Sequence, residues 1–379
     1  MTSSDRSARI VVIGAAGVVG RRVCAELARR DLPIAIAGHR GVGLAALART
    51  LPVAAVHFAD VHDARALARA VTGAAVVVNA AGPLRATAAP VLAAALAAGA
   101  HYVDVGGEQA VLRELYERHE SAVRHAGRVA VPGAGLDCLI GDLAVAWAAR
   151  RLLGVADPGA ALRDELAPRL ADDDPVDDIS VSYAYDGLTI SAGTQRALFG
   201  AIGTRVQVWR RDRWEDGRAG DHRRIDAGPQ GARDAIAYAA GDPITIPRHV
   251  TAQLVAAYVS TTRRPGTTAA LRVLARVLRV LPRTAADLLA PYAASDADYA
   301  QTELAVVARV RRGPNAAQIV VRGRDLYRTT AAITAWAAAQ LAGRAAGPIG
   351  MRAPGELFRG EPALREIARA ADLTIEPSF

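Results

Sequence analysis

The chain has 379 residues and a mass of 39.5 kDa, with 51% hydrophobic and 22% charged residues, which is typical of a globular protein. All 46 Lys+Arg residues are arginine, because the sequence contains no lysine. This excludes lysine Schiff-base enzymes, phosphate loops of the G-x-x-x-x-G-K-[ST] type and the Tyr-x-x-x-Lys site of short-chain dehydrogenases. The net charge is +8, but the arginines are scattered among acids and only 4% of residues are aromatic, so we expect no nucleic-acid binding.

The cysteines and the N-terminal residues bear on the compartment. Cys24 and Cys138 lie far apart, without the spacing of a metal site or a disulfide framework. The first residues, Met-Thr-Ser-Ser-Asp-Arg, contain no apolar signal core, and the longest apolar stretches, such as Ala86–Ala98, are too short to cross a membrane. We therefore expect a cytoplasmic protein without a metal.

The first part of the chain alternates short apolar runs with helical patterns. Such a rhythm predicts a doubly wound parallel sheet, whose buried strands are almost wholly apolar. We expect strands at Arg9–Ile13, Ile34–Ala37, Val53–Phe58, Ala75–Val78, His101–Val105 and Arg128–Val131, and helices at Val18–Arg30, Leu44–Thr50, Asp63–Val71, Pro90–Ala98, Glu108–His125 and Ile140–Leu153. Residues 1–150 are accordingly assigned to a dinucleotide-binding Rossmann domain.

A glycine-rich turn joins the first expected strand to the first helix. It reads Gly14-Ala15-Ala16-Gly17-Val18-Val19-Gly20, a G-x-x-G-x-x-G variant of the dinucleotide fingerprint. The glycines permit a tight turn, a close approach of backbone N–H groups to a pyrophosphate and close packing of the helix on the sheet. The turn predicts a dinucleotide site; a glycine turn without a ligand is the alternative.

The end of the second strand indicates which dinucleotide binds. NAD sites usually place an acid there to bind the ribose 2′-hydroxyl, whereas this strand ends in His39-Arg40. Arg40 can meet a 2′-phosphate, so NADP(H) is favoured over NAD, unless Arg40 is an ordinary surface arginine.

Two further turns complete the predicted cofactor site. After the third strand, Asp60-Val61 is expected at the edge of the adenine pocket, although Asp60 is equally suited to capping a helix. After the fourth strand, Asn79-Ala80-Ala81-Gly82-Pro83 offers small residues that let the backbone lie against the cofactor.

Polar side chains gather where the fifth and sixth strands end. Tyr102 and Asp104 belong to the first of these ends and Asp137 to the second. Ligands bind at this edge of such sheets. Structural roles stay open for the acids, since Asp104 can hold the following glycine loop and Asp137 can cap the next helix.

The second part of the chain lacks the regular alternation of strands and helices. The acidic run Asp172–Asp178 is most simply a solvated linker. The runs after it alternate like strands of a mixed sheet, at Ile179–Tyr185, Val206–Trp209, Ala256–Val259, Leu304–Arg311 and Gln318–Arg322. Thr268–Ala290 reads as a basic amphipathic helix, suited to weak contact with a membrane surface, with a solvated surface helix as the simpler alternative. We assign residues 151–324 to an α+β substrate and dimerisation domain.

The last segment, 325–379, begins with a helical pattern at Leu326–Leu341. We expect it to pack back on the Rossmann domain.

In their order along the chain, these motifs resemble those of the saccharopine dehydrogenase-like oxidoreductases. The resemblance rests on Gly14–Gly20, Val78–Pro83, Gly99–Glu108, Pro132–Leu143, Ser191–Thr194, Arg322–Thr330 and Gly347–Gly350. It is better to the branch that includes trans-acting enoyl reductases than to the lysine-pathway enzymes. The resemblance implies a nicotinamide-dependent enzyme with a Rossmann domain and a mixed second domain.

We therefore predict an NADP(H)-dependent oxidoreductase that passes hydride to a polarised C=C bond of a small-molecule or acyl substrate. Tyr102, Asp137 and Tyr185 are candidate proton donors, and Arg196 is a candidate to bind a substrate carboxylate or carbonyl. An imine or amino-acid reductase of saccharopine type and a non-catalytic NADP(H)-binding sensor are the alternatives. A homodimer is the default expectation.

Overall fold

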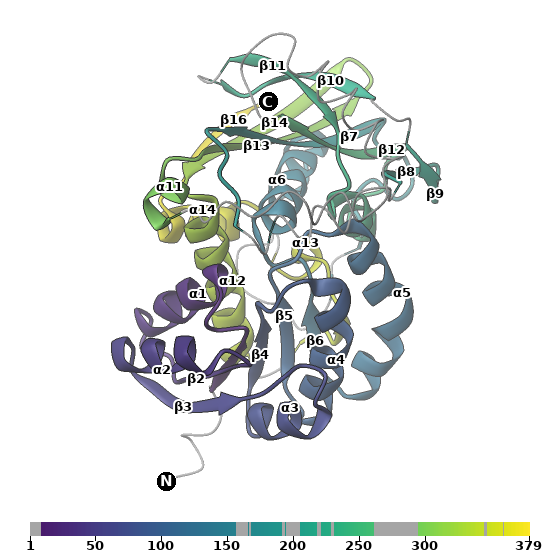
Figure 1. Ribbon diagram of the computed structural model, residues 1–379. Coiled ribbons are helices and arrows are strands. Elements are labelled where there is room, and N and C mark those ends of the chain that lie inside the picture. Colours follow the sequence, from purple (N-terminus) through teal and green to yellow (C-terminus); the bar gives the residue numbers. More distant parts are fainter. Residues whose placement is uncertain are drawn as a thin grey trace.

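Two sheets, one above the other, organise the computed structural model (Figure 1). The structure describes residues 9–156, 166, 168–191, 194, 205–217, 221–228, 231–260, 295–344, 347–358 and 360–379. The predicted basic helix at 268–290 and Arg196 lie outside these residues.

The first sheet has seven strands in the order β15-β6-β5-β4-β1-β2-β3, all parallel. Its strands are β1 (Ile10–Ile13), β2 (Ile34–Gly38), β3 (Val53–Phe58), β4 (Val76–Asn79), β5 (His101–Asp104), β6 (Val129–Val131) and β15 (Gly350–Met351). Apart from the short β15, this is the strand order of a Rossmann domain, as predicted. In such sheets, ligands bind at the carboxyl ends of the strands beside the reversal of strand order, which here lies next to β1.

Helices cover both faces of this sheet. Helices α1 (Val18–Ala28), α2 (Gly41–Thr50) and α12 (Leu326–Ala342) lie on one face, and α3 (Ala64–Val71), α4 (Leu84–Ala97) and α5 (Gln109–His125) on the other. Val12 and Val78 point to the first set, whereas Val11 and Val77 point to the second. Because both faces are buried, these strands need an unbroken apolar sequence, which is why they were predictable.

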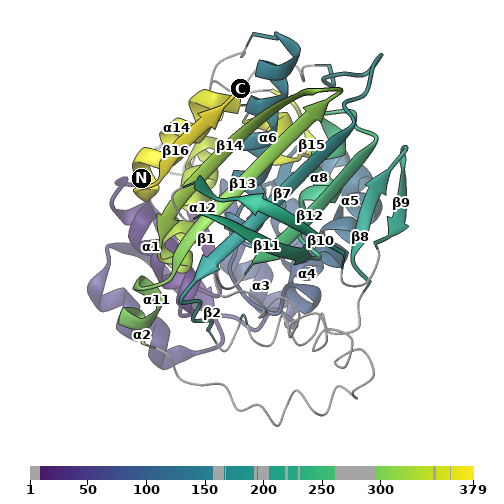
Figure 2. The same ribbon diagram turned by 90° about the horizontal axis from the view of Figure 1, so that it is seen from above.

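The second sheet has nine strands, with β10-β11-β12-β7-β13-β14-β16 in order and a β8–β9 hairpin beside β12. Its strands are β7 (Asp178–Asp186), β8 (Gln207–Arg210), β9 (Arg213–Asp216), β10 (His222–Asp226), β11 (Ala232–Ala237), β12 (Leu254–Ser260), β13 (Glu303–Arg312), β14 (Asn315–Arg324) and β16 (Thr374–Ser378). Figure 2 shows β12, β7, β13 and β14 side by side. Only β7 and β12 are parallel neighbours in this sheet, which confirms a mixed second sheet.

The remaining elements connect the two sheets. A π-helical turn, η2 (Leu136–Ile140), leads into α6 (Gly141–Leu153), which packs against β13 and β14. The short elements are α8 (Asp242–Thr245), η4 (Ile246–Arg248), α11 (Asp296–Ala300) and α13 (Pro354–Leu357), and α14 (Gly360–Ala371) packs on α6. The segment after Arg324 serves both sheets, since α12 packs on α1 while β16 pairs with β14.

The acidic run corrects one expectation, because it is not a free linker. Asp178 begins β7 and pairs with Arg223 at 2.8 Å. Asp177 accepts from the Arg311 guanidinium at 3.1 Å and from the Gly313 N–H at 2.7 Å. Arginines on neighbouring strands therefore hold the end of the run, a pairing that a single stretch of sequence does not reveal.

Candidate active site

The glycine-rich loop lies between β1 and α1 at the carboxyl edge of the first sheet. Gly14 has φ of +78°, and a Cβ there would lie 2.7 Å from the Ala80 carbonyl carbon. A Cβ at Gly20 would overlap the Gly14 carbonyl oxygen, so α1 approaches the loop as closely as glycine permits. Ala15 is buried, and Ala16, Gly17, Val18 and Val19 are half-buried. The first turn of α1 contains no acidic side chain, which suits a bound pyrophosphate.

His39 and Arg40 follow β2, and both are exposed. Among the described residues Arg40 has no ion-pair partner, so its guanidinium is available to a phosphate. Asp60 is also exposed and accepts a hydrogen bond from the His62 N–H, and Val61 beside it is half-buried. These positions fit the predicted end of the cofactor site that carries the adenine and the 2′-phosphate.

The turn after β4 is held against the glycine loop by its own side chains. Asn79 is fully buried and accepts from the Ala81 N–H at 3.1 Å. The Ala80 N–H donates to the Ile13 carbonyl at 2.9 Å, and the Thr87 hydroxyl donates to the Ala81 carbonyl at 2.6 Å. A Cβ at Gly82 would meet no atom within 4 Å. Asn79 therefore fixes the turn, and Ala80–Pro83 presents small residues beside the loop.

Asp104, at the end of β5, is a structural clamp. Its Oδ1 accepts from the Gly106 N–H at 3.0 Å and from the Gly133 N–H at 2.9 Å, and its Oδ2 accepts from the Tyr102 hydroxyl at 2.9 Å. Burial raises the pKa of the Asp104 carboxyl above its usual range, while these donors counteract the shift. This confirms that Asp104 holds the glycine loop.

Tyr102, another candidate proton donor, lies in the core. Its side chain is 0% exposed and lies in the core between the sheet and the α3–α5 face, where burial raises the pKa of its hydroxyl well above the usual value. The hydroxyl is engaged with Asp104 and Asn79. Tyr102 therefore supports the loop from within, and its predicted role as a proton donor stays a prediction.

Asp137 and Tyr185, by contrast, meet across the two sheets. The Tyr185 hydroxyl, at the end of β7, donates to Asp137 Oδ1 at 2.6 Å, and Asp137 lies in the π-helical turn η2. Such turns are rare and frequent at functional sites. Asp137 caps no helix, because neither η2 nor α6 has a side-chain cap. The fold thus brings together two predicted catalytic residues.

Burial dominates the electrostatics of this pair. It raises the pKa of the Asp137 carboxyl, although the hydrogen bond from Tyr185 lowers it in part. Burial, followed by the nearby Asp137 charge, raises the pKa of the Tyr185 hydroxyl well above its usual value. Both pKa values are thus shifted toward the protonated forms, relative to the free side chains, which suits proton donation.

Three residues near the pair were missed by the sequence analysis. The Tyr183 hydroxyl donates to Asp242 at 2.9 Å, and burial, followed by the charge of Asp137, raises the pKa of Tyr238. Tyr183 precedes Tyr185 by two residues and lies on the same face of β7. The alternation of the strand could therefore have placed Tyr183 beside Tyr185 from the sequence. Asp242 comes from α8, which no local pattern connects to β7.

A series of contacts joins the cofactor loop to the pair. The turn after β4 touches Gly14, and a Cβ at Gly106 would overlap the Leu84 side chain of α4. A Cβ at Gly107 would lie 2.8 Å from the Asp137 Cβ. The segments that follow successive strands of the sheet therefore contact one another from the glycine loop to Asp137.

The second-domain motif also finds its partner. The Ser191 N–H donates to the Tyr327 hydroxyl at 2.6 Å, and the Thr194 hydroxyl lies 2.8 Å from it. Arg196 follows this motif but lies outside the described residues, so its predicted substrate contact stays a prediction.

No metal or membrane feature was found in the described part of the chain. It contains no group of three or more His, Cys, Asp and Glu side chains placed to hold a metal ion. Nor does that part contain a helix long and apolar enough to cross a membrane.

Part of the chain is similar in sequence to known proteins. Residues 10–131 match the model of the saccharopine dehydrogenase NADP binding domain. A lipid droplet localized protein of Caenorhabditis elegans is 32% identical over 148 residues, 36% of this chain and 35% of that protein. A Mycobacterium tuberculosis protein, provisionally named a trans-acting enoyl reductase, is 32% identical over 151 residues, 38% of this chain and 36% of that protein. The chain thus matches about a third of the length of these relatives.

A solved structure shares the whole fold. Apo saccharopine dehydrogenase (L-Glu forming) from Saccharomyces cerevisiae superposes with a TM-score of 0.60 at 14% identity, covering 98% of this chain and 100% of that one. The glycine loop, the acid-free start of α1 and the unpaired Arg40 fit NADP, the cofactor for which the matched domain is named. Residues 10–131 are thus similar in sequence to a saccharopine dehydrogenase NADP binding domain, and the whole chain shares the fold of the yeast enzyme.

Proposed function

We propose that the protein is an NADP(H)-dependent reductase that acts on a polarised C=C bond of a small-molecule or acyl substrate. The observation that carries this proposal is the hydrogen bond between half-buried Asp137 and buried Tyr185, at the strand edge that continues from the cofactor loop. Such a pair supplies the proton that a reduction needs after hydride transfer.

In the proposed reaction, the cofactor and the Asp137–Tyr185 pair have separate roles. NADPH, when bound over Gly14–Gly20 with its 2′-phosphate near Arg40, supplies the hydride. Tyr185 gives its hydroxyl proton to the substrate carbon that carries the developing negative charge. Asp137, protonated in this scheme, returns a proton to the Tyr185 oxygen along their hydrogen bond. Solvent reprotonates Asp137 between turnovers.

The surroundings of the pair favour an uncharged reacting group. The pKa of Tyr185 is raised by burial and by the nearby Asp137, Tyr238 and Asp242. Among the described residues, no arginine is identified as a cause of this shift. Arg233, on β11, is engaged with Asp186 in a bidentate ion pair. A substrate with several carboxylates would need cations here. An imine or amino-acid reductase is therefore the second candidate, favoured only by the fold of the yeast enzyme.

A substrate panel tests the proposal. Purified protein is mixed with NADPH and with enones, imines and keto acids, and NADPH oxidation is followed by absorbance. We expect turnover with an enone and none with an imine. Turnover that needs an amine co-substrate would support the second candidate. Tight NADPH binding without turnover on any member would instead support a non-catalytic sensor.

The same proposal includes the substrate class, the oligomeric state and the cellular compartment of the protein. The names of two relatives concern lipid droplets and enoyl reduction, which supports an acyl chain as the substrate class. We propose that the protein is a cytoplasmic homodimer that binds no nucleic acid; size-exclusion chromatography with light scattering tests the dimer. The predicted membrane contact through residues 268–290 also remains a proposal.

A further inference from the structure

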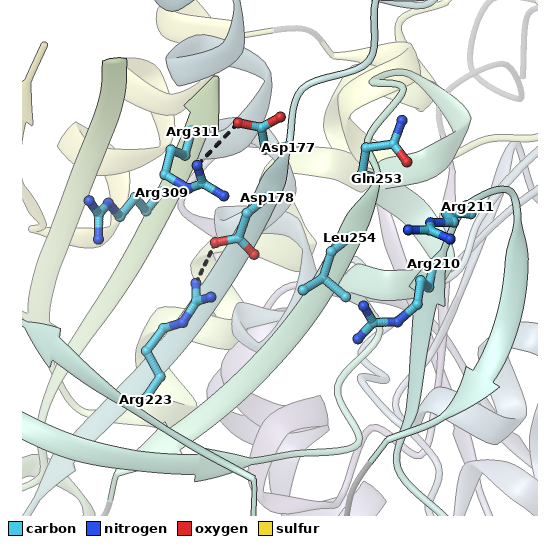
Figure 3. A pocket seen from close by; sticks show the side chains of 9 residues that line it. All are labelled: Asp177, Asp178, Arg210, Arg211, Arg223, Gln253, Leu254, Arg309 and Arg311. Atoms are coloured by element: carbon cyan, nitrogen blue, oxygen red, sulfur yellow. Dashed lines mark hydrogen bonds and ion pairs between the residues drawn. The ribbon is translucent and has the colours of Figure 1, made fainter. Parts of the chain in front are cut away.

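A hollow lined by arginines lies on the second sheet, far from the cofactor edge. It has a volume of about 730 Å³ and is lined by Asp177, Asp178, Arg210, Arg211, Arg223, Gln253, Leu254, Arg309 and Arg311 (Figure 3). Its floor includes the start of β7, whereas Tyr185 stands near the end of that strand, roughly 23 Å away at the usual rise per residue. The hollow is therefore separate from the proposed active site.

Its charges do not cancel. Arg223 pairs with Asp178, Arg311 with Asp177, and Arg210 with Glu215 of the neighbouring strand at 3.2 Å. Arg211 and Arg309 are both exposed, and no described carboxylate pairs with either. They stand on opposite sides of the hollow, one on the β8–β9 turn and the other on β13 (Figure 3). The hollow thus holds an excess of guanidinium groups.

The backbone at Arg211 is a second, independent observation. The β8–β9 hairpin closes with Arg211 at φ of +48° and Asp212 at φ of +61°. A two-residue turn with positive φ at both positions normally carries Asn-Gly or Asp-Gly, because a Cβ is strained there. The Arg211 N–H donates to the Gln253 carbonyl at 3.1 Å, which holds the turn against the wall of the hollow. Strained residues of this kind cluster at functional sites.

We propose that this hollow binds a phosphate-bearing organic molecule. Arginine matches phosphate geometry with paired N–H donors, and a volume of this size accommodates an organic group besides the phosphate. Leu254 and the aliphatic stems of the arginines offer that group an apolar surface. The ligand's source is either a soluble phosphate ester or the headgroup of an anionic lipid.

The experiment uses the full chain saturated with NADPH, so that the cofactor site is filled. Inorganic pyrophosphate is titrated by calorimetry into the wild type and into four variants, Arg211→Gly, Arg309→Gln, Asp212→Gly and Arg69→Gln. Arg211→Gly removes the guanidinium and relieves the strain, so pyrophosphate affinity should fall about tenfold or more while the melting temperature stays equal or rises. Arg309→Gln should weaken binding to a similar extent.

The other two variants are matched controls. Asp212→Gly relieves strain in the same turn but keeps Arg211, so it should bind pyrophosphate at least as well as the wild type. Arg69, on α3, is an exposed arginine outside the hollow, and Arg69→Gln should leave binding unchanged. The proposal is wrong if pyrophosphate does not bind once NADPH is present, or if Arg211→Gly and Arg309→Gln bind like the wild type.

Vesicle sedimentation then separates the two sources of phosphate. Phosphatidylcholine vesicles with and without phosphatidic acid are compared for the same proteins. Retention only with phosphatidic acid, and lost in Arg211→Gly and Arg309→Gln, assigns the hollow to a lipid headgroup. Pyrophosphate binding without vesicle retention assigns it to a soluble phosphate ester. Neither outcome depends on turnover, so failure of the proposed reductase activity is judged separately.

Discussion

An aspartate lies at the end of β5 and another in the turn after β6, but the buried Asp104 and the half-buried Asp137 have different hydrogen-bond partners. Asp104 accepts hydrogen bonds from two backbone N–H groups and from the Tyr102 hydroxyl. Asp137 accepts one hydrogen bond among the described residues, from Tyr185. The first carboxylate has its strong acceptor positions filled, whereas the second keeps capacity for another partner.

This difference separates support from chemistry. A carboxylate filled by backbone donors fixes loops and resists change, because each donor left unpaired in the interior costs free energy. A carboxylate with one donor and a raised pKa is held less tightly and can exchange a proton. The same edge of the sheet therefore contains a rigid part around Asp104 and a part around Asp137 that we propose is the reactive part.

The largest expected effect concerns the reactive part. Tyr185→Phe should lower kcat by about 10²–10⁴-fold, because it removes the proton donor and keeps the ring in place. Steady-state NADPH oxidation with the enone found by the panel measures this. Unchanged turnover, with NADPH affinity also unchanged, would remove Tyr185 from the mechanism.

The next effect concerns the rigid part. Asp104→Ala leaves two buried N–H groups and a tyrosine hydroxyl without their acceptor, so we expect a loss of about 3–5 kcal/mol in the free energy of unfolding. Urea denaturation followed by circular dichroism measures it. A loss below about 1 kcal/mol would show that Asp104 is not a clamp.

Arg40 differs from both aspartates, because it is exposed and forms no ion pair with a described carboxylate. Arg40→Ala should weaken NADPH binding about tenfold and leave NADH binding unchanged, since only NADPH carries the 2′-phosphate. Fluorescence titration with both cofactors gives the ratio. If the ratio of the two affinities stays the same, the 2′-phosphate is bound elsewhere.

Tyr102 and Tyr185 form a matched pair of tyrosines. Tyr102→Phe should cost about 1–2 kcal/mol of stability, since it removes the hydrogen bonds to Asp104 and Asn79, and leave kcat within about twofold of the wild type. Thermal denaturation and the same enone assay measure the two quantities. A fall in kcat as large as that of Tyr185→Phe would contradict the placement of Tyr102 in the core.

The smallest effect is a pH dependence of stability. Because the folded-state pKa of Asp137 is raised, the stability that this group contributes is fully present below its unfolded pKa of about 3.9 and is lost as pH rises through the folded pKa. Asp137→Asn does not titrate, so its melting temperature should exceed that of the wild type at neutral pH and converge with it in acid. A difference that is independent of pH would contradict this.

Much of the first sheet could be predicted because its information is local. The strand Ile34–Ala37 and the helix Asp63–Val71 were found nearly to the residue, since the strand is buried on both faces and Asp63 caps the helix with its own side chain. The helix expected at Pro90–Ala98 begins earlier, at Leu84, because Pro90 is tolerated inside it.

The second sheet was predicted less completely. Strands β7, β13 and β14 alternate and were found, but β10, β11 and β16 were not. The β10 sequence His-Arg-Arg-Ile-Asp has no clear alternation, and β16 contains Pro377 at the edge of its sheet. Pairing with a neighbour, rather than local pattern, makes these segments strands.

By itself, then, the sequence determined the predicted cofactor loop. The turn at Gly14–Gly20 and the position of Arg40 directly after β2 depend on residues that are neighbours in the sequence. Only the tertiary structure distinguished the two acids by their hydrogen-bond partners. Asp104 and Asp137 look alike in sequence, but one is filled by donors from two loops while the other meets Tyr185 from a different sheet. Only the fold, too, gathers Arg211 and Arg309 around one hollow. Hydrogen bonds and charges between distant segments depend on packing, which no local pattern records.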